Sequence, residues 1–330
     1  MSRQQARRLC NDFIRRKYSD NEMAEMLLAL ARKPETSEEV SGFVDAMLEN
    51  SEPFPSREAS IDVCGTGGSK LERFNVSTAV AFILASIGLR VAKHGNRGSH
   101  KSNGSFDLLE ALGIPINLNG DQLSEILEKT GLAFLFAGKF HPAMKNVANA
   151  RRIAEQRTIF NLAGPLSNPA NINKQVIGTT DAGFFELLLE SSKAVGRDKC
   201  LVVSGHPGID ELSITGDSTY RTTWSNSLFT VTPEQIGIER TISSKIPCGD
   251  ADKNAKEFMK LMDGNGNAHL ESMVCANAGL VMACNDTTLS IQDGTRMAKE
   301  AMHARQVKHK FDEYKKLAMK AARQTKGMDF

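Results

Sequence analysis

The sequence has almost no excess of charge: 41 Lys and Arg stand against 39 Asp and Glu, a formal net charge of +2 over 330 residues. A protein that coats nucleic acid or an anionic membrane needs a clear basic excess, so we expect neither partner, although a local basic pocket remains compatible. The chain has no run of 18 apolar residues, and no apolar segment follows its basic start. We therefore expect no membrane span and no export signal.

Cysteine pairs are also missing. The six cysteines form no CxxC pair and have no histidine at zinc-finger spacing. This pattern predicts reduced, mostly buried thiols in a cytoplasmic protein. With 41% hydrophobic and 24% charged residues, the composition is that of an ordinary globular protein, and the length predicts one large and one smaller domain.

The hydrophobic pattern changes along the chain. Residues 1–60 predict short helices, with capping-box spacing at Ser19 and Glu22 and again at Thr36 and Glu39. From Ile61 on, short apolar runs that end near glycine alternate with helical patterns, which indicates a largely parallel α/β sheet. Beyond about Pro247 the pattern is mainly helical. We expect a small all-helical domain over 1–60, joined by helices from about 150–170, and an α/β catalytic domain over 61–330.

The ligands of such a sheet bind outside the carboxyl ends of its strands, so the loops that follow strands are the first candidates for a site. The first loop is Gly65-Thr66-Gly67-Gly68-Ser69-Lys70, which precedes a helix that begins near Asn75-Val76-Ser77-Thr78. Glycines let backbone N–H groups approach a phosphate, and hydroxyl groups at a helix N-terminus add donors. The loop has neither Walker nor GxGxxG spacing, and an ordinary tight turn explains it equally well.

The second loop runs from Lys93 to Ser105 and holds three cations, two histidines, two asparagines and three glycines. Anion donors at this density, at the same sheet edge as the first loop, favour a binding site over a merely exposed polar loop.

The third loop, 205–211, ends in Asp210-Glu211. Paired carboxylates suit Mg²⁺, which takes one or two of them together with phosphate oxygens and water. Between the last two loops, residues 141–169 carry several arginines, and one of these could hold a carboxylate with its planar fork.

These pieces, in this order, closely resemble the anthranilate phosphoribosyltransferases of tryptophan biosynthesis. The matching segments are GTGG, NVST, KHGNR, GSFDLLEALGI, FHPAMKNVANARR, RTIFNLAGPLSNPAN and GIDELS. The resemblance covers nearly the whole chain. It implies a transferase that is usually a homodimer, has its active site between a helical and an α/β domain, and joins anthranilate to phosphoribosyl pyrophosphate (PRPP).

The resemblance also implies site residues. Two Mg²⁺ ions would be held, one by Ser77 with Glu211 and one by Asp210 with Glu211, and Gly65, Asn96 and Arg151 would position anthranilate. It implies no acid, base or nucleophile, since an aryl amine is neutral at physiological pH and catalysis would rest on positioning and electrostatics. The residues expected to contact PRPP are Gly65, Gly68, Ser69, Arg73, Asn75, Val76, Ser77, Thr78, Lys93, His94, Gly95, Asn96, Arg97, Lys101 and Ser105.

Several residues depart from the family pattern. Ser69, Lys70 and Arg73 stand where the family has an acidic residue, a glycine and a threonine. In the second loop, the basic residue that the family has before Ser-Gly-Ser is shifted to Lys101. The added cations make the first loop more attractive to anions and leave the acceptor open. The alternatives are a related transferase or phosphorylase with another aromatic acceptor, and a non-catalytic relative that binds nucleic acid.

Overall fold

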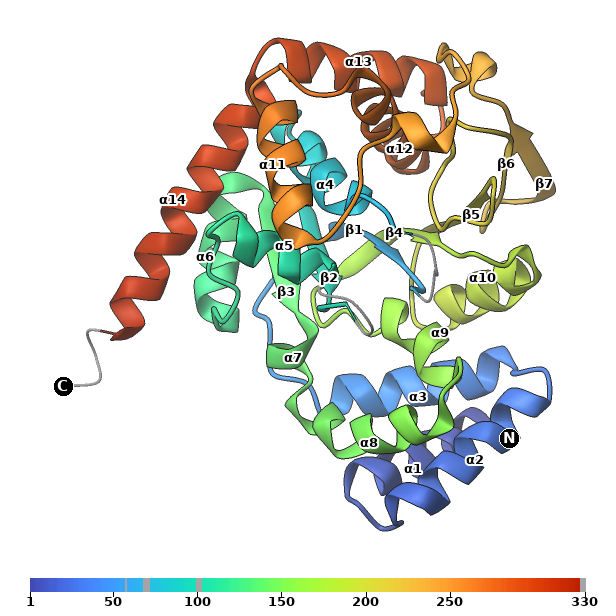
Figure 1. Ribbon diagram of the computed structural model, residues 1–330. Coiled ribbons are helices and arrows are strands. Elements are labelled where there is room, and N and C mark those ends of the chain that lie inside the picture. Colours follow the sequence, from blue (N-terminus) through green and yellow to red (C-terminus); the bar gives the residue numbers. More distant parts are fainter. Residues whose placement is uncertain (57, 68–71, 99–102, 327–330) are drawn as a thin grey trace.

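A seven-stranded sheet forms the centre of the computed structural model, which describes residues 1–56, 58–67, 72–98 and 103–326 (Figure 1). The strand order is β3-β2-β1-β4-β5-β6-β7; β3 to β5 pair in parallel, whereas β6 and β7 add an antiparallel edge. The strands are β1 (Ser60–Gly65), β2 (Val91–Gly95), β3 (Leu132–Phe136), β4 (Ile172–Gly178), β5 (Lys199–Gly205), β6 (Ser218–Thr222) and β7 (Ser225–Val231).

Helices cover both faces of this sheet and form a bundle below it (Figure 1). The bundle helices are α1 (Arg3–Ile14), α2 (Asp20–Arg32), α3 (Ser37–Glu49), α8 (Lys145–Ala154) and α9 (Ile159–Leu166). The others are α4 (Val76–Ser86), α5 (Ser105–Ala111), α6 (Gly120–Thr130), α7 (Ala137–Phe140), α10 (Phe185–Ala194), α11 (Ala251–Met262), α12 (Ala268–Asn285), α13 (Ile291–His303) and α14 (Gln306–Lys326).

The predicted fold class is confirmed: a helical N-terminal part, a mostly parallel α/β sheet and a helical C-terminal part. Both expected capping boxes are formed, with Ser19 and Thr36 as N-caps of α2 and α3. The six cysteines are free, and four of them are buried. In the part of the chain that the structure describes, no helix combines the length and the apolar character that crossing a bilayer requires.

Two apolar cores lie on opposite faces of the sheet, because successive strand residues point to opposite sides. On β4 and β5, Val176 and Leu201 belong to the larger core with α4, α12 and α14, whereas Ile177 and Val202 belong to the second. The second core continues into the bundle, where Phe43 of α3 packs edge-on against Phe160 of α9 at 5.2 Å. The bundle and the sheet therefore share a core.

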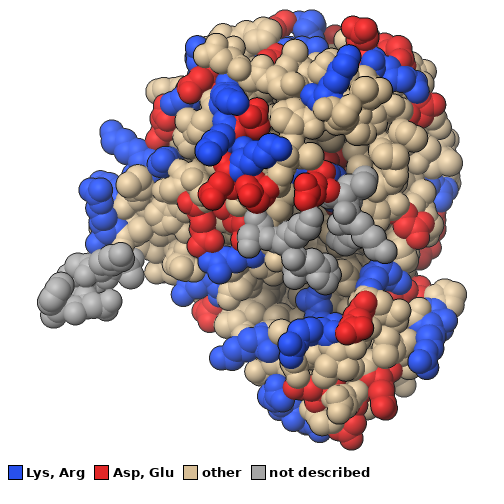
Figure 2. Space-filling view, viewed as in Figure 1, with Lys and Arg blue, Asp and Glu red and all other residues tan. Residues whose placement is uncertain are grey.

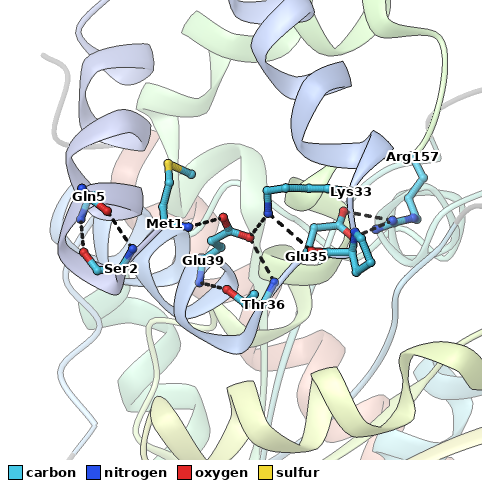
Figure 3. A network of polar contacts seen from close by, with 9 residues as sticks. Met1, Ser2, Gln5, Lys33, Glu35, Thr36, Glu39 and Arg157 are labelled. Carbon is cyan, nitrogen blue, oxygen red and sulfur yellow. Dashed lines mark hydrogen bonds and ion pairs between the residues drawn. The ribbon is translucent and has the colours of Figure 1, made fainter.

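A polar network supports the start of α3 (Figure 3). The fully buried Glu39 accepts from the amino group of Met1 at 2.7 Å and from Lys33 Nζ at 2.5 Å. Burial by itself would raise the pKa of Glu39, but these contacts and the Thr36 amide outweigh it and lower that pKa. Nearby, Arg157 donates to both carboxylate oxygens of Glu35, at 3.0 and 3.1 Å, and covers the Phe184 ring at 4.3 Å. Arg157 therefore connects the bundle to the segment before α10.

Replacing Arg157 with alanine should lower the free energy of unfolding by about 3 kcal/mol, because the Glu35 side chain, 3% exposed, would keep a buried charge without its partner. Urea denaturation measures the change. Arg7→Ala is the control, since Arg7 makes an exposed pair with Glu49 within the bundle and should cost well under about 1 kcal/mol. Equal losses in the two variants would contradict the structural role given to Arg157.

Candidate functional site

The carboxyl ends of β1, β4 and β5 lie level at one edge of the sheet. Gly65 pairs with Gly178, and Gly178 pairs with Val203 two residues before the end of β5. The space-filling view shows a hollow between the bundle and the larger body, with side chains of both charge signs along its rims (Figure 2). The three loops singled out in the sequence follow β1, β2 and β5, and parallel pairing brings the carboxyl ends of these strands to the same edge.

Glycines at the strand ends make room for the acidic loop. A Cβ atom on Gly65 would lie 2.4 Å from Asp210 Oδ2, and one on Gly178 would lie 1.7 Å from the carbonyl oxygen of Asp210. A Cβ atom on Gly205 would lie 2.3 Å from the carbonyl oxygen of Glu211. The chain at 210–211 therefore packs directly against the strands, and a side chain at any of these three positions would displace it.

The carboxylates of Asp210 and Glu211 are mostly buried, with side chains 9% and 14% exposed. Arg73 Nη1 forms an ion pair with Asp210 Oδ1 and lies 3.9 Å from Glu211 Oε2. Burial raises the pKa of Glu211 to about 7, although Arg73 acts in the opposite direction. Glu211 Oε2 is buried and finds no hydrogen-bond donor among the described residues. A buried carboxylate oxygen without a hydrogen-bond donor can accept a cation as its partner.

Asn254 of α11 connects the first two loops. Its Nδ2 lies within 2.9 Å of the Arg73 carbonyl oxygen, 2.8 Å of Asn103 Oδ1 and 3.1 Å of Asn75 Oδ1. Asn103 Nδ2 also donates to the Arg73 carbonyl oxygen at 2.9 Å. Sequence reasoning missed Asn254, although it lies on the same face as Phe258 and Leu261, where a buried amide signals a specific hydrogen-bonding role.

Asn277 of α12 holds the acidic loop from the other side. Its Oδ1 accepts from the backbone N–H of Leu212 at 2.8 Å, and its Nδ2 donates to the carbonyl oxygen of Leu212 at 2.9 Å. This two-point contact fixes the chain directly after Glu211. Asn277 was not among the predicted site residues; its signal in the sequence is an asparagine within an otherwise apolar helix.

Lys93 and His94 are buried residues of β2, close to its carboxyl end. Lys93 is 2% exposed, its Nζ donates to the Val63 carbonyl oxygen at 2.6 Å, and burial lowers its pKa. The His94 ring is buried against the His141 ring at 5.1 Å, and burial lowers its pKa well below the usual range. Their contact with PRPP stays a prediction, and the burial of both side chains argues against a direct side-chain contact.

The loop after β2 is fixed to the start of α5. Asp107 Oδ2 accepts from the backbone N–H groups of Gly98 and Gly104, at 2.8 and 2.7 Å. Ser105 Oγ donates to the Asn96 carbonyl oxygen at 3.3 Å, close enough that a Cβ on Gly95 would lie 2.5 Å from this hydroxyl. The side chains of Asn96 and Arg97 are exposed, which suits binding residues.

The start of α4 supplies hydroxyl groups near the first loop. Ser77 is partly exposed, and Val76 and Thr78 are buried. Asn75 is the N-cap, but its side chain bonds to Asn103 and Asn254 and makes no capping hydrogen bond to the helix. Thr78 Oγ1 is buried and has no hydrogen-bond partner within the described ranges. The remaining predicted residues of the two loops, Gly68, Ser69 and Lys101, lie outside the described residues.

Arg151 is on α8, so the predicted site draws on the bundle as well as on the sheet. Its side chain is exposed, and its guanidinium carbon lies 5.5 Å from the centre of the Phe160 ring. No hydrogen bond or ion pair joins Arg151 to another residue in the described part of the chain. The guanidinium is therefore available for an anionic ligand.

Comparison with known proteins matches two family models: the helical bundle domain of a glycosyl transferase family over residues 1–51 and its a/b domain over 57–306. An anthranilate phosphoribosyltransferase of Persephonella marina is 37% identical over 96% of this chain and 95% of its own length. The chain belongs to the anthranilate phosphoribosyltransferase family. The resemblance inferred from the motifs is thereby confirmed.

Solved structures of this family share the fold. The anthranilate phosphoribosyltransferase of Thermus thermophilus is 30% identical, with a TM-score of 0.91 over 97% of this chain and 96% of that chain. The Saccharomyces cerevisiae enzyme in complex with PRPP and Mg is 23% identical, with a TM-score of 0.84 over 91% of this chain and 86% of that chain. The helical bundle and the sheet are thus family features.

Proposed function

We propose that this chain transfers the 5-phosphoribosyl group of PRPP to the amine of anthranilate, giving N-(5-phosphoribosyl)anthranilate and pyrophosphate for tryptophan biosynthesis. The observation that carries the proposal is the pair of Asp210 and Glu211, packed against glycine-lined strand ends beside the start of α4. Family membership at 37% identity supports the same reaction. A binding scaffold would have no need for two carboxylates held at the sheet edge.

The donor set at this edge fits Mg²⁺. Glu211 Oε2 has no hydrogen bond from the described residues, and Ser77 provides a partly exposed hydroxyl. Mg²⁺ needs few protein ligands when phosphate oxygens and water complete its shell, and the described residues contain no cluster of three His, Cys, Asp or Glu that would enclose a metal. When bound with PRPP, the ion neutralises charge on the leaving pyrophosphate.

The chain's own residues would act by binding and orientation. The N-terminus of α4, where Asn75 makes no side-chain cap, would direct its helix dipole toward an anion, which lowers the energy of charge that develops on the pyrophosphate. We assign Gly65, Asn96 and Arg151 to anthranilate. The aryl amine is neutral near pH 7, so its attack on C1 of the ribose requires no strong base.

A turnover assay tests the reaction. Anthranilate fluorescence should fall after PRPP and Mg²⁺ are added to the protein, and pyrophosphate should appear in equal amount. Unchanged fluorescence with folded protein would rule out anthranilate as the acceptor. If the protein instead bound single-stranded nucleic acid tightly in low salt and showed no turnover, the non-catalytic alternative would replace this proposal.

Replacing Arg151 with alanine should raise the KM for anthranilate on the order of 100-fold and leave the KM for PRPP nearly unchanged, because a charged hydrogen bond to a carboxylate contributes about 2–3 kcal/mol. Steady-state kinetics measures both constants. The matched control is Arg152→Ala, since Arg152 is the exposed neighbour whose Nη2 donates to Asn149 at 2.6 Å. An unchanged anthranilate KM in the Arg151 variant would remove this assignment.

We further propose that the enzyme is a cytoplasmic homodimer, as the family resemblance implies. The free thiols support a reducing compartment. Light scattering on the purified protein measures its mass against the 36.0 kDa of one chain.

A further inference from the structure

Arg73 places a positive charge at the Asp210–Glu211 pair. Its Nη1 contacts Asp210 Oδ1 and lies 3.9 Å from Glu211 Oε2, with 21% of the side chain exposed. These are the two carboxylates to which the sequence resemblance assigns the second of two magnesium ions. The sequence resemblance implies a threonine at this position, where this chain has a guanidinium.

The surrounding structure fixes the backbone of Arg73. Its carbonyl oxygen accepts from Asn254 and from Asn103, each at 2.9 Å, and the next residue, Phe74, is 3% exposed within the larger core. With its carbonyl oxygen held twice and the next residue buried, Arg73 has a fixed position from which its side chain reaches Asp210. Burial alone would lower the pKa of Arg73, but the charges of Glu211 and Asp210 outweigh it and raise that pKa.

A guanidinium and a divalent ion compete for the same pair of carboxylates, since they repel each other at contact distance. We propose that Arg73 replaces one of the two magnesium ions: its guanidinium neutralises Asp210, and the chain binds a single divalent ion, through Glu211 and Ser77, together with the diphosphate. This inference rests on the proposed function.

Arg73 can also donate hydrogen bonds to the diphosphate of the substrate. A guanidinium has five N–H donors in a rigid plane, and the contact with Asp210 occupies only part of them. The other donors suit diphosphate oxygens, because the planar fork of arginine matches the geometry of phosphate. Arg73 is thus a positioning residue that supplies fixed charge where an ion would have to be bound from solution.

Equilibrium dialysis with Mn²⁺ and pyrophosphate tests the inference without any turnover. The unsubstituted protein should retain one Mn²⁺ for each pyrophosphate, whereas Arg73→Thr should retain two. In the absence of pyrophosphate, the variant should bind Mn²⁺ at least tenfold more tightly than the unsubstituted protein. Two ions in the unsubstituted protein, or an unchanged ratio and affinity in folded Arg73→Thr, would overturn the inference.

Two further variants separate charge from geometry. Arg73→Lys keeps a cation and should keep a ratio of one; a ratio of two would contradict replacement of the ion by charge. Arg240→Thr removes an exposed arginine that also joins two carboxylates, those of Asp217 and Glu234, and should leave the ratio at one. If it also gave two, freed carboxylates in general would explain the gain and the inference would fail.

The inference and the proposed function fail in different ways. Should Arg73→Thr not fold, the ratio in the unsubstituted protein still decides the inference. Absence of anthranilate turnover, with one Mn²⁺ per pyrophosphate retained, would remove the acceptor and keep the role of Arg73.

Discussion

Gly178→Ala should lower kcat/KM on the order of 100-fold and destabilise the protein by about 1–3 kcal/mol. The new Cβ would lie 1.7 Å from the carbonyl oxygen of Asp210, so the backbone of the acidic loop must move away from β4. A displacement of about 1 Å at residues that position a reacting group can cost this much in rate. Steady-state kinetics and urea denaturation measure the two effects.

Gly164→Ala is the matched control. Gly164 lies in α9, and a Cβ there would meet no atom within 4 Å, so kinetics and stability should stay near those of the unsubstituted protein. If both variants behaved alike, the close approach of the acidic loop to β4 would not matter for activity.

Glu211→Gln should reduce turnover on the order of 1,000-fold, because the ligand that we assign to the remaining metal ion loses its charge and several kcal/mol of transition-state stabilisation goes with it. The same substitution should raise the free energy of unfolding, and this gain in stability should grow as pH rises. The pKa of Glu211 is about 7 in the folded chain against an ordinary 4.5, so the folded state keeps a proton that the unfolded state releases between these values. Ionised Glu211 therefore destabilises the fold above pH 7.

The gain in unfolding free energy of Glu211→Gln over the unsubstituted protein should be larger at pH 8 than at pH 4 by about 3 kcal/mol. Denaturation curves at both pH values test this. Glu190→Gln, which removes an exposed carboxylate on α10, serves as the control. A gain that is the same at both pH values would contradict the burial of Glu211.

Most of the fold could be predicted from short-range patterns in the sequence. Serine and threonine caps with glutamate three residues on identified α2 and α3, and glycine-ended apolar runs identified β1 to β5, since both patterns act within a few residues. The β6–β7 hairpin was not predicted. Its turn at Thr223-Trp224 has no glycine or asparagine, and β7 is largely exposed, so neither turn chemistry nor burial marked it.

The site was predictable where residues are neighbours in the chain. The three loops and the Asp210–Glu211 pair could be found because each follows a strand. The contacts that arrange them could not: Asn254 lies about 180 residues from Arg73, and Asn277 lies 65 residues from Leu212. Such partners depend on how distant helices pack, which periodicity within one segment does not encode.

The shared core has a consequence during synthesis. Helices α1–α3 leave the ribosome before the sheet does, and the apolar partners that complete their core, from Val147 of α8 to Val202 of β5, are made about 100 to 150 residues later. At about 5–20 residues per second this delay lasts roughly 5 to 30 s, during which the apolar faces of the first helices stay uncovered. The nascent N-terminal part is therefore the stretch on which a chaperone would be expected to act.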